Sequence, residues 1–278
     1  MGVLNVTPDS FSDGGLYHSA GDAVAHGLSM MDDGADILDI GGESTRPGQP
    51  ERLSDADEQG RVLPVIAAIL KARPDAMISI DTYKASTAKA AVEAGAEIVN
   101  DVSGFLWDHE MAATCTNLSC GVVLMHTRGR PDEWRSQPRL AANDVLPLVR
   151  RDLEQRLQAA LDAAIPRNRI VLDPGYGFGK RFHENYALLA RQTELRELGQ
   201  PLVAGVSRKS FLARALRSLY GGADAPMEDR LHATLAATTA SILAGTDIVR
   251  VHDVRPAVEA ALIADAILTS DSGDPGGS

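Results

Sequence analysis

The stretch "MISIDTYKASTAKAAVEAGAEIVND" (77–101) contains the repeating unit of this chain. Two apolar runs rich in β-branched residues, 77–81 and 97–101, have the character of buried strands. Between them, 84–95 has the composition of a helix and ends at Gly95, a residue type that commonly stops helices. Apolar strands separated by a helix are typical of parallel sheets covered by helices. The stretch therefore predicts an α/β fold.

The same unit recurs along the whole chain. Strand-like runs lie at 2–6, 36–40, 77–81, 97–101, 121–126, 169–173, 202–207 and 247–251. Helix-like segments lie at 19–34, 54–72, 84–95, 108–118, 143–164, 184–197, 230–244 and 255–269. Eight strand–helix pairs in 278 residues predict a (β/α)8 TIM barrel, with an open doubly wound sheet as the alternative. No linker divides the chain, which predicts a single domain over 1–269 and a disordered tail over 270–278.

Composition and charge narrow the functional class. With 44% hydrophobic and 23% charged residues the chain has an ordinary globular composition, and its net charge of −11 argues against a nucleic-acid partner. The apolar runs are too short to span a membrane, and no signal peptide is recognisable. Cys115 and Cys120 are not spaced as a metal or redox motif and suit a reducing cytoplasm. We therefore expect a cytoplasmic protein that binds small molecules.

Polar side chains stand at the ends of almost all the predicted strands. In a TIM barrel these carboxyl ends meet at one mouth, where active sites lie. Alone, each residue could be a helix cap or a loop hydrogen bond, and Asp39 could simply tie down the glycines after it. Together they predict a pocket with donors and acceptors for a planar heterocycle and cations for an anion. The residues are Asn5, Asp39, Asp81, Asn100, His126, Asp173, Ser207, Arg208, Lys209, Arg250 and His252.

Two segments favour an anion site. "GGESTRPG" (41–48) follows the second strand, and Arg46 within it carries a guanidinium fork suited to phosphate oxygens. "RVHD" (250–253) places Arg250 and His252 on the same side of a strand, because side chains alternate with period two. A structural histidine is the alternative there. Both segments predict recognition of an anionic group at the barrel mouth.

Other common motifs are missing. "DPGYGFGKR" (173–181) follows a strand and is rich in glycine, but it lacks the glycine and the Ser or Thr of a phosphate loop and the third glycine of a dinucleotide loop. No HExxH segment, closely spaced cysteine pair or Gly-x-Ser-x-Gly elbow occurs. Nucleotide binding, zinc hydrolysis and serine acyl transfer are therefore unsupported. The polar loop 128–138 suggests no role.

Seven segments in chain order resemble the dihydropteroate synthase family, and the likeness extends from Met1 to about residue 269. They are "MGVLNVTPDSFSDGG", "DIGGESTRPG", "SIDT", "VNDVSG", "LDPGYGFGK", "SRKSFL" and "VRVHDV". The resemblance implies a homodimeric barrel that condenses 6-hydroxymethyl-7,8-dihydropterin diphosphate with 4-aminobenzoate. The products would be 7,8-dihydropteroate and pyrophosphate, a transferase reaction of folate biosynthesis that uses Mg²⁺.

The resemblance also implies three subsites. The pterin would bind at Asp81, Asn100, Met125, Asp173 and Lys209. The pyrophosphate would bind at Asn5, Arg46, Arg250 and His252, with Asn5 as the protein ligand of Mg²⁺. The 4-aminobenzoate, which sulfonamide drugs mimic, would lie near Phe11, Thr45, Arg46, Pro47 and Ser210. The catalytic set would be Asp81, Asp173, Lys209, Arg250 and His252, with the first two loops closing over the substrates.

The bond that breaks suggests how the reaction proceeds. Pyrophosphate leaves from a methylene attached to an electron-rich dihydropterin, which favours ionisation first and attack by the neutral arylamine second. Two alternatives stay open. A methyltetrahydrofolate-dependent methyltransferase has a similar pocket on a similar barrel, and a paralogue without catalysis would keep the pocket alone.

Overall fold

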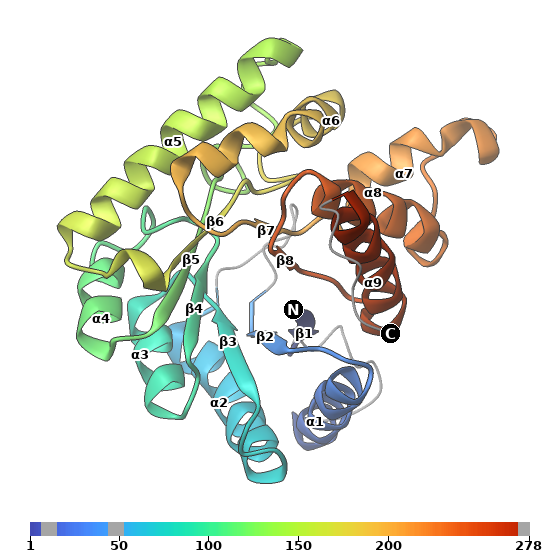
Figure 1. Ribbon diagram of the computed structural model, residues 1–278. Coiled ribbons are helices and arrows are strands. Elements are labelled where there is room, and N and C mark those ends of the chain that lie inside the picture. The colour runs from blue at the N-terminus through green and yellow to red at the C-terminus, as the bar shows by residue number, and fades with distance from the viewer. Residues whose placement is uncertain (7–15, 44–52, 272–278) are drawn as a thin grey trace.

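The structure is a computed structural model and describes residues 1–6, 16–43 and 53–271. Short parallel strands form its centre and helices surround them (Figure 1). The strands are β1 (Gly2–Asn5), β2 (Ile37–Gly41), β3 (Met77–Asp81), β4 (Ile98–Asp101), β5 (Gly121–Met125), β6 (Ile170–Asp173), β7 (Val203–Ala204) and β8 (Ile248–Val249). The helices are α1 (Leu16–Asp32), α2 (Asp55–Ala72), α3 (Ala85–Glu93), α4 (Met111–Leu118), α5 (Ala142–Asp162), α6 (Phe182–Ala190), α7 (Ser210–Ala215), α8 (Leu231–Leu243) and α9 (Val254–Asp271).

The strands close into a barrel. β1 to β6 form one parallel sheet in chain order, and β7 pairs with β8 in parallel. Two single bridges join these sheets, Leu172 with Leu202 between β6 and β7, and Gly2 with Val251 between β1 and the residues after β8. The amide of Val3 donates to the carbonyl of Val251 at 2.9 Å. The predicted (β/α)8 barrel is confirmed, because an open sheet would leave β1 and β8 apart.

Strand alternation separates an apolar outer layer from a polar barrel interior. In β3, Ile78 and Ile80 are fully buried toward the helices, where Ile66 of α2 is also fully buried. Burying side chains of this size stabilises the fold by roughly 1.5–3 kcal/mol each. Ser79 and Asp81 alternate with these isoleucines along the strand. They face the barrel axis because side chains of a strand point to opposite sides in turn. The core therefore lies between strands and helices, which leaves the strand ends free for polar chemistry.

The structure differs from the sequence prediction at two places. The helix predicted over 184–197 ends at Ala190, and a 3₁₀ helix follows over Gln192–Leu198. The break occurs where Gln192 turns inward and is fully buried, accepting a hydrogen bond from Tyr176 at 2.6 Å and donating one to Thr246 at 2.7 Å. The short helix α7 was not predicted, so the connection between β7 and β8 contains two α-helices.

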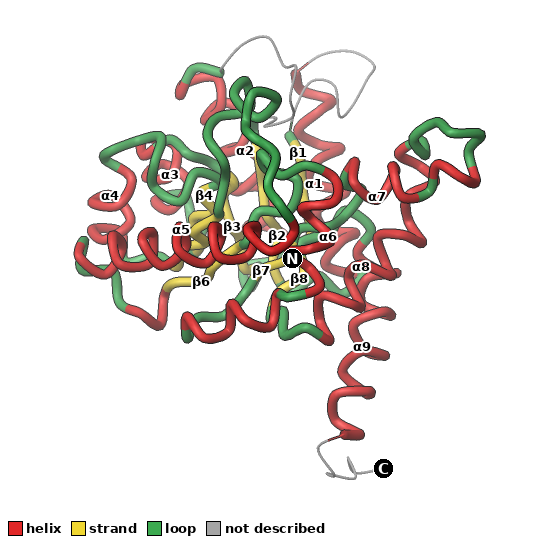
Figure 2. Tube along the Cα trace, turned by 90° about the horizontal axis from the view of Figure 1, so that it is seen from above, coloured by secondary structure: helices red, strands yellow, loops and turns green. Residues whose placement is uncertain are grey.

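The last helix extends beyond the barrel body (Figure 2). α9 continues to Asp271, past the predicted domain boundary at residue 269, and residues 272–278 of the predicted tail lie outside the described residues. Cys115 and Cys120 are buried and free, as expected from their spacing. Within the described ranges, no helix is both long and apolar enough to cross a membrane.

Candidate active site

A cavity of about 400 Å³ opens at the carboxyl ends of the strands. Eight of the predicted site residues line it: Asn5, Asp81, Ser207, Arg208, Lys209, Ser210, Arg250 and His252. They come from β1, β3, the segment after β7, the start of α7 and the segment after β8. Barrel closure therefore brings together side chains that lie far apart in the sequence, as the strand-end pattern predicts.

Arg250 is the central charge of the cavity floor. Its Nε donates to Oδ2 of Asp39 at 2.6 Å, and its Nη2 donates to Oδ2 of Asp81 at 2.6 Å. Asp39 is fully buried and also accepts from the hydroxyl of Ser79 at 2.6 Å and the amide of Asn100 at 3.0 Å. Asp39 thus has a structural role, although its partners inside the barrel are not the glycines considered from sequence. Asn100 and Arg250 are held in place through it.

The carboxylates of this site are electrostatically unusual. Burial raises the pKa of Asp81 to about 7, with the charge of Asp39 adding to the effect and Arg250 opposing it. Burial likewise raises the pKa of Asp173, against the backbone N–H of Gly175, which donates to Asp173 at 2.7 Å. Burial alone would lower the pKa of Arg250, but Asp39 and Asp81 raise it above its usual value. Perturbed groups gathered at neighbouring strand ends of one barrel mouth are typical of functional sites.

Asp173 and Met125 lie side by side at the ends of β6 and β5, as paired residues of the sheet. Both are buried. The turn after Asp173 requires glycine at position 175, where φ is +66° and a Cβ would lie only 1.9 Å from the carbonyl oxygen of His126. The turn brings the loop after β6 tightly against the end of β5, which fixes the direction of the Asp173 carboxylate.

His252 is held by Ser207. Its Nδ1 lies 3.0 Å from the Ser207 hydroxyl, which also accepts the His252 backbone N–H at 3.2 Å. Both residues line the cavity. The neighbouring Arg208 also lines the cavity, and its guanidinium is held in an ion pair with Asp253, in which its Nε lies 2.9 Å from a carboxylate oxygen. Both adjacent cations, Arg208 and Lys209, therefore border the predicted pocket, and Asp253 balances the charge of Arg208.

Several cavity residues were not predicted from the sequence. Trp134 comes from the loop after β5, and Phe178 from the glycine-rich loop after β6. Their rings pack edge to face, with centroids 5.2 Å apart. The sequence did contain one signal for Trp134, since it is an aromatic residue in an otherwise polar loop after a barrel strand. Further unpredicted lining residues are Glu43, Met227 and Arg230.

Part of the predicted site lies outside the described residues. This holds for Phe11, Thr45, Arg46 and Pro47, and so for most of the predicted 4-aminobenzoate subsite. Among the described residues, no group of three or more His, Cys, Asp or Glu side chains could hold a metal. Asn5 lines the cavity and offers one amide oxygen, a ligand type that Mg²⁺ accepts. Such an ion would take its other ligands from substrate oxygens and water.

Comparison with known proteins identifies the family of this chain. A family model described as pterin binding enzyme matches residues 1–252. Dihydropteroate synthase of Bacillus subtilis (strain 168) is 44% identical over 268 residues, which cover 96% of this chain and 88% of that protein. The chain belongs to the dihydropteroate synthase family of pterin-binding enzymes.

Solved structures of dihydropteroate synthases superpose closely on the barrel. The Xanthomonas albilineans dihydropteroate synthase with 4-aminobenzoic acid is 40% identical, with a TM-score of 0.86 over 96% of this chain and 92% of that one. The Yersinia pestis dihydropteroate synthase with a sulfonamide drug is 37% identical, with a TM-score of 0.86 over 97% and 93% of the two chains.

Proposed function

We propose that this chain condenses 6-hydroxymethyl-7,8-dihydropterin diphosphate with 4-aminobenzoate, giving 7,8-dihydropteroate and pyrophosphate in folate biosynthesis. Membership of the dihydropteroate synthase family supports this transferase reaction. The observation that carries it is one cavity at the barrel mouth lined by Asp81, Lys209 and His252. The cavity combines an acceptor, a cation and an imidazole in the arrangement that a heterocycle with an anionic leaving group requires.

The pterin subsite is formed by Asp81, Asn100, Met125, Asp173 and Lys209. Carboxylate oxygens accept from the N–H groups of an aminopyrimidinone edge, and an ammonium donates to a carbonyl or ring nitrogen. Burial raises the pKa of the Asp173 carboxyl group, and Lys209 is close enough for its charge to oppose this shift. Met125, buried at the end of β5, supplies an apolar surface beneath the ring.

The pyrophosphate subsite is formed by Asn5, Arg46, Arg250 and His252. The ion pairs of Arg250 with Asp39 and Asp81 fix the position of its guanidinium before substrate binds. Such preorganised donors stabilise charge that develops on a leaving group without further reorganisation. The Nδ1 of His252 lies 3.0 Å from the Ser207 hydroxyl, which fixes the orientation of the imidazole ring in the cavity.

The reaction begins with ionisation at the pterin methylene, and the amine of 4-aminobenzoate attacks afterwards. Asp81 and Asp173 stabilise the cationic pterin, while Arg250 and His252 hold the departing pyrophosphate. The arylamine is neutral at pH 7 and needs no strong base. Mg²⁺ at Asn5 would supply further neutralisation of the leaving anion.

The remaining assignments concern binding partners and location. The 4-aminobenzoate subsite includes Ser210, at the start of α7, and the loop residues Phe11, Thr45, Arg46 and Pro47. Because a dihydropteroate synthase of the same family binds a sulfonamide drug, we expect this chain to be inhibited by sulfonamides that compete with 4-aminobenzoate. We expect a cytoplasmic homodimer. One folded domain would extend from residue 1 to the end of α9 at Asp271, with a short tail after it.

The test is a direct assay of the purified protein with pterin diphosphate, 4-aminobenzoate and Mg²⁺. Stoichiometric release of pyrophosphate and 7,8-dihydropteroate is the expected result. Pterin binding without product would indicate a paralogue without catalysis, and methyl transfer from methyltetrahydrofolate would indicate the alternative enzyme class. Either outcome would contradict the proposed function.

A further inference from the structure

The loop between β5 and α5 brings one aromatic side chain to the active-site mouth. Trp134 is half-buried and lines the cavity. Its indole Nε1–H donates to the carbonyl oxygen of Gly129 at 3.1 Å and to the hydroxyl of Thr127 at 3.2 Å. These bonds tie the polar edge of the indole to its own loop. The ring is thereby held against the neighbouring loop after β6.

A chain of ring contacts connects Trp134 to Lys209. The Trp134 and Phe178 rings pack edge to face, 5.2 Å between centroids and 83° between planes. The Lys209 ammonium lies 4.1 Å from the centroid of the Phe178 ring. Edge-to-face pairs and cation–π contacts are directional as well as stabilising. The orientation of the Phe178 ring, and with it the position of the ammonium, therefore depends on Trp134.

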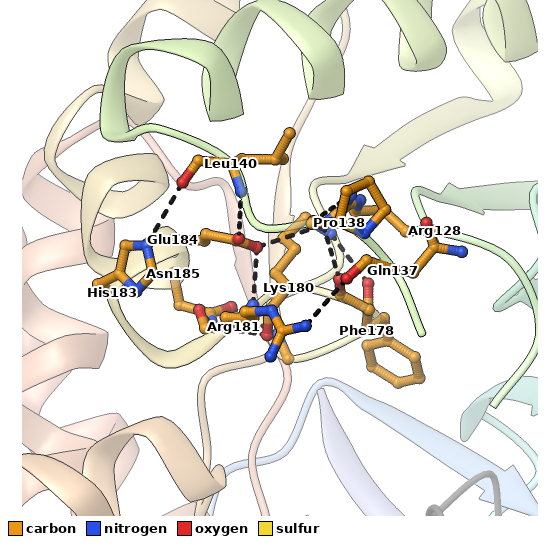
Figure 3. A network of polar contacts seen from close by, with 12 residues as sticks. Arg128, Gln137, Pro138, Leu140, Phe178, Lys180, Arg181, His183, Glu184 and Asn185 are labelled. Carbon is orange, nitrogen blue, oxygen red and sulfur yellow. Dashed lines mark hydrogen bonds and ion pairs between the residues drawn. The ribbon is translucent and has the colours of Figure 1, made fainter. Parts of the chain in front are cut away.

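Buried polar contacts fasten the loop that carries Trp134 (Figure 3). Glu184 at the start of α6 is fully buried and accepts the backbone N–H groups of Leu140 at 2.9 Å and Arg181 at 2.7 Å. Arg128 lies 3.4 Å from the same carboxylate, and Arg181 donates to the carbonyl of Gln137 at 3.0 Å. Both ends of the loop are thus attached to the segment that begins α6.

The two loops also approach each other without intervening side chains. Gly179 has a φ of +70°, and a Cβ at this position would lie 2.7 Å from the Cβ of Arg128. The Arg128 guanidinium donates to the Gly179 carbonyl at 3.2 Å. Close packing of this kind makes the loops after β5 and β6 a single rigid wall of the cavity.

We propose that Trp134 is a positioning residue of the pterin subsite: it fixes the Phe178 ring, which in turn holds the Lys209 ammonium toward the bound pterin. The inference rests on the proposed pterin subsite. Trp134 acts through Phe178 on a group that binds the pterin in ground and transition states alike. Its loss therefore weakens pterin binding more than it slows the chemical step.

The test compares two apolar replacements of the indole. Trp134→Leu keeps bulk without a ring, and Trp134→Phe keeps a ring that can pack on Phe178. For Trp134→Leu we expect the KM and the calorimetric Kd for pterin diphosphate to rise about three- to tenfold. This fold-change corresponds to the interaction energy of one aromatic pair. The kcat and the KM for 4-aminobenzoate should change less than twofold, and Trp134→Phe should recover most of the lost affinity.

Trp107 provides the matched control. It forms a similar edge-to-face pair with Tyr83, at 5.1 Å and 76°, but does not line the cavity. Trp107→Leu should lower the thermal unfolding midpoint without raising the KM for pterin diphosphate. Equal effects of Trp134→Leu and Trp107→Leu on this KM would show a merely structural role and overturn the inference.

Lys209→Ala separates the inference from the proposal on which it rests. If Lys209→Ala weakens pterin binding and Trp134→Leu does not, the positioning role fails while the pterin subsite stands. If Lys209→Ala binds pterin diphosphate as the wild type does, the subsite itself fails and the role of Trp134 with it. A Trp134→Phe variant as weak as Trp134→Leu would also contradict a role for the ring contact.

Discussion

Arg250 and Asp81 form an ion pair of 2.6 Å inside the barrel mouth although 169 positions separate them in the sequence. Asp39, bound to the same guanidinium at 2.6 Å, completes the group. One part-buried cation thus compensates two carboxylates from adjacent strands, the fully buried Asp39 and the part-buried Asp81. Removing it would leave both charges without their partner in a region of low dielectric constant, which is costly.

Arg250→Ala should lower the free energy of unfolding by about 3–5 kcal/mol, because it breaks a buried ion pair from one side. Urea denaturation measures the change. Arg255→Ala is the control, since the pair of Arg255 with Glu259 on α9 is exposed and should contribute less than about 0.5 kcal/mol. A loss below about 1 kcal/mol for Arg250→Ala would argue that Arg250 serves the leaving group alone.

Lys209→Ala and Asp173→Ala should each reduce kcat/KM at least about 100-fold, because each would remove a proposed charged contact to the reacting pterin. Pyrophosphate release measures the rate. Lys89→Ala, on an exposed face of α3, should leave it unchanged. Near-normal turnover in either site variant would mean that the pterin lies elsewhere in the mouth.

Asn5→Ala should raise the Mg²⁺ concentration needed for half-maximal activity by about tenfold, because it removes the proposed protein ligand of the ion. Activity titrated with Mg²⁺ after treatment with a chelator measures this. Asn117→Ala, at an exposed position of α4, is the control. An unchanged Mg²⁺ requirement in Asn5→Ala would exclude Asn5 as a ligand.

Acid should destabilise the fold through His126. Burial lowers the pKa of this imidazole to about 3, with the charge of Lys180 adding to the effect. Below its ordinary pKa of 6.5 the unfolded chain takes up a proton that the folded chain does not. The contribution of His126 to stability is thus complete above pH 6.5 and is lost as the pH falls toward 3, by up to about 1.4 kcal/mol per unit.

Urea unfolding at pH 7 and pH 5 tests this sign. Between these values the wild type should lose about 2 kcal/mol more than His126→Gln, which has no titrating group at this position. Asp81 and Asp101, whose pKa values burial raises to about 7 and about 6, act in the opposite direction in both proteins and cancel in the comparison. Equal losses in the two proteins would contradict a buried neutral histidine.

Much of the fold could be predicted because its signals are local. Ile78 and Ile80 alternate with polar Ser79 and Asp81, so a strand with one apolar side is readable from a few residues. Helix boundaries were less predictable. α6 ends where Gln192 finds buried partners at Tyr176 and Thr246, and such partners have no signature in the local sequence.

The sequence by itself determined the α/β alternation, the number of strands and the residues that end them. Strand direction and side-chain alternation are properties of the backbone, so Asn5, Asp81 and Lys209 had to reach the mouth once the barrel closed. Its seven ordered segments also determined the family, because each residue of a motif is read without knowledge of its neighbours in space.

Only the tertiary structure decided which of these groups meet. The sharing of Arg250 between Asp39 and Asp81, and the packing of Trp134 on Phe178, depend on distances between segments that are remote in the chain. Charges and rings interact over a few ångströms, whereas the sequence records only their order. The pKa of Asp81 and the wall behind Lys209 are therefore products of barrel closure and loop packing.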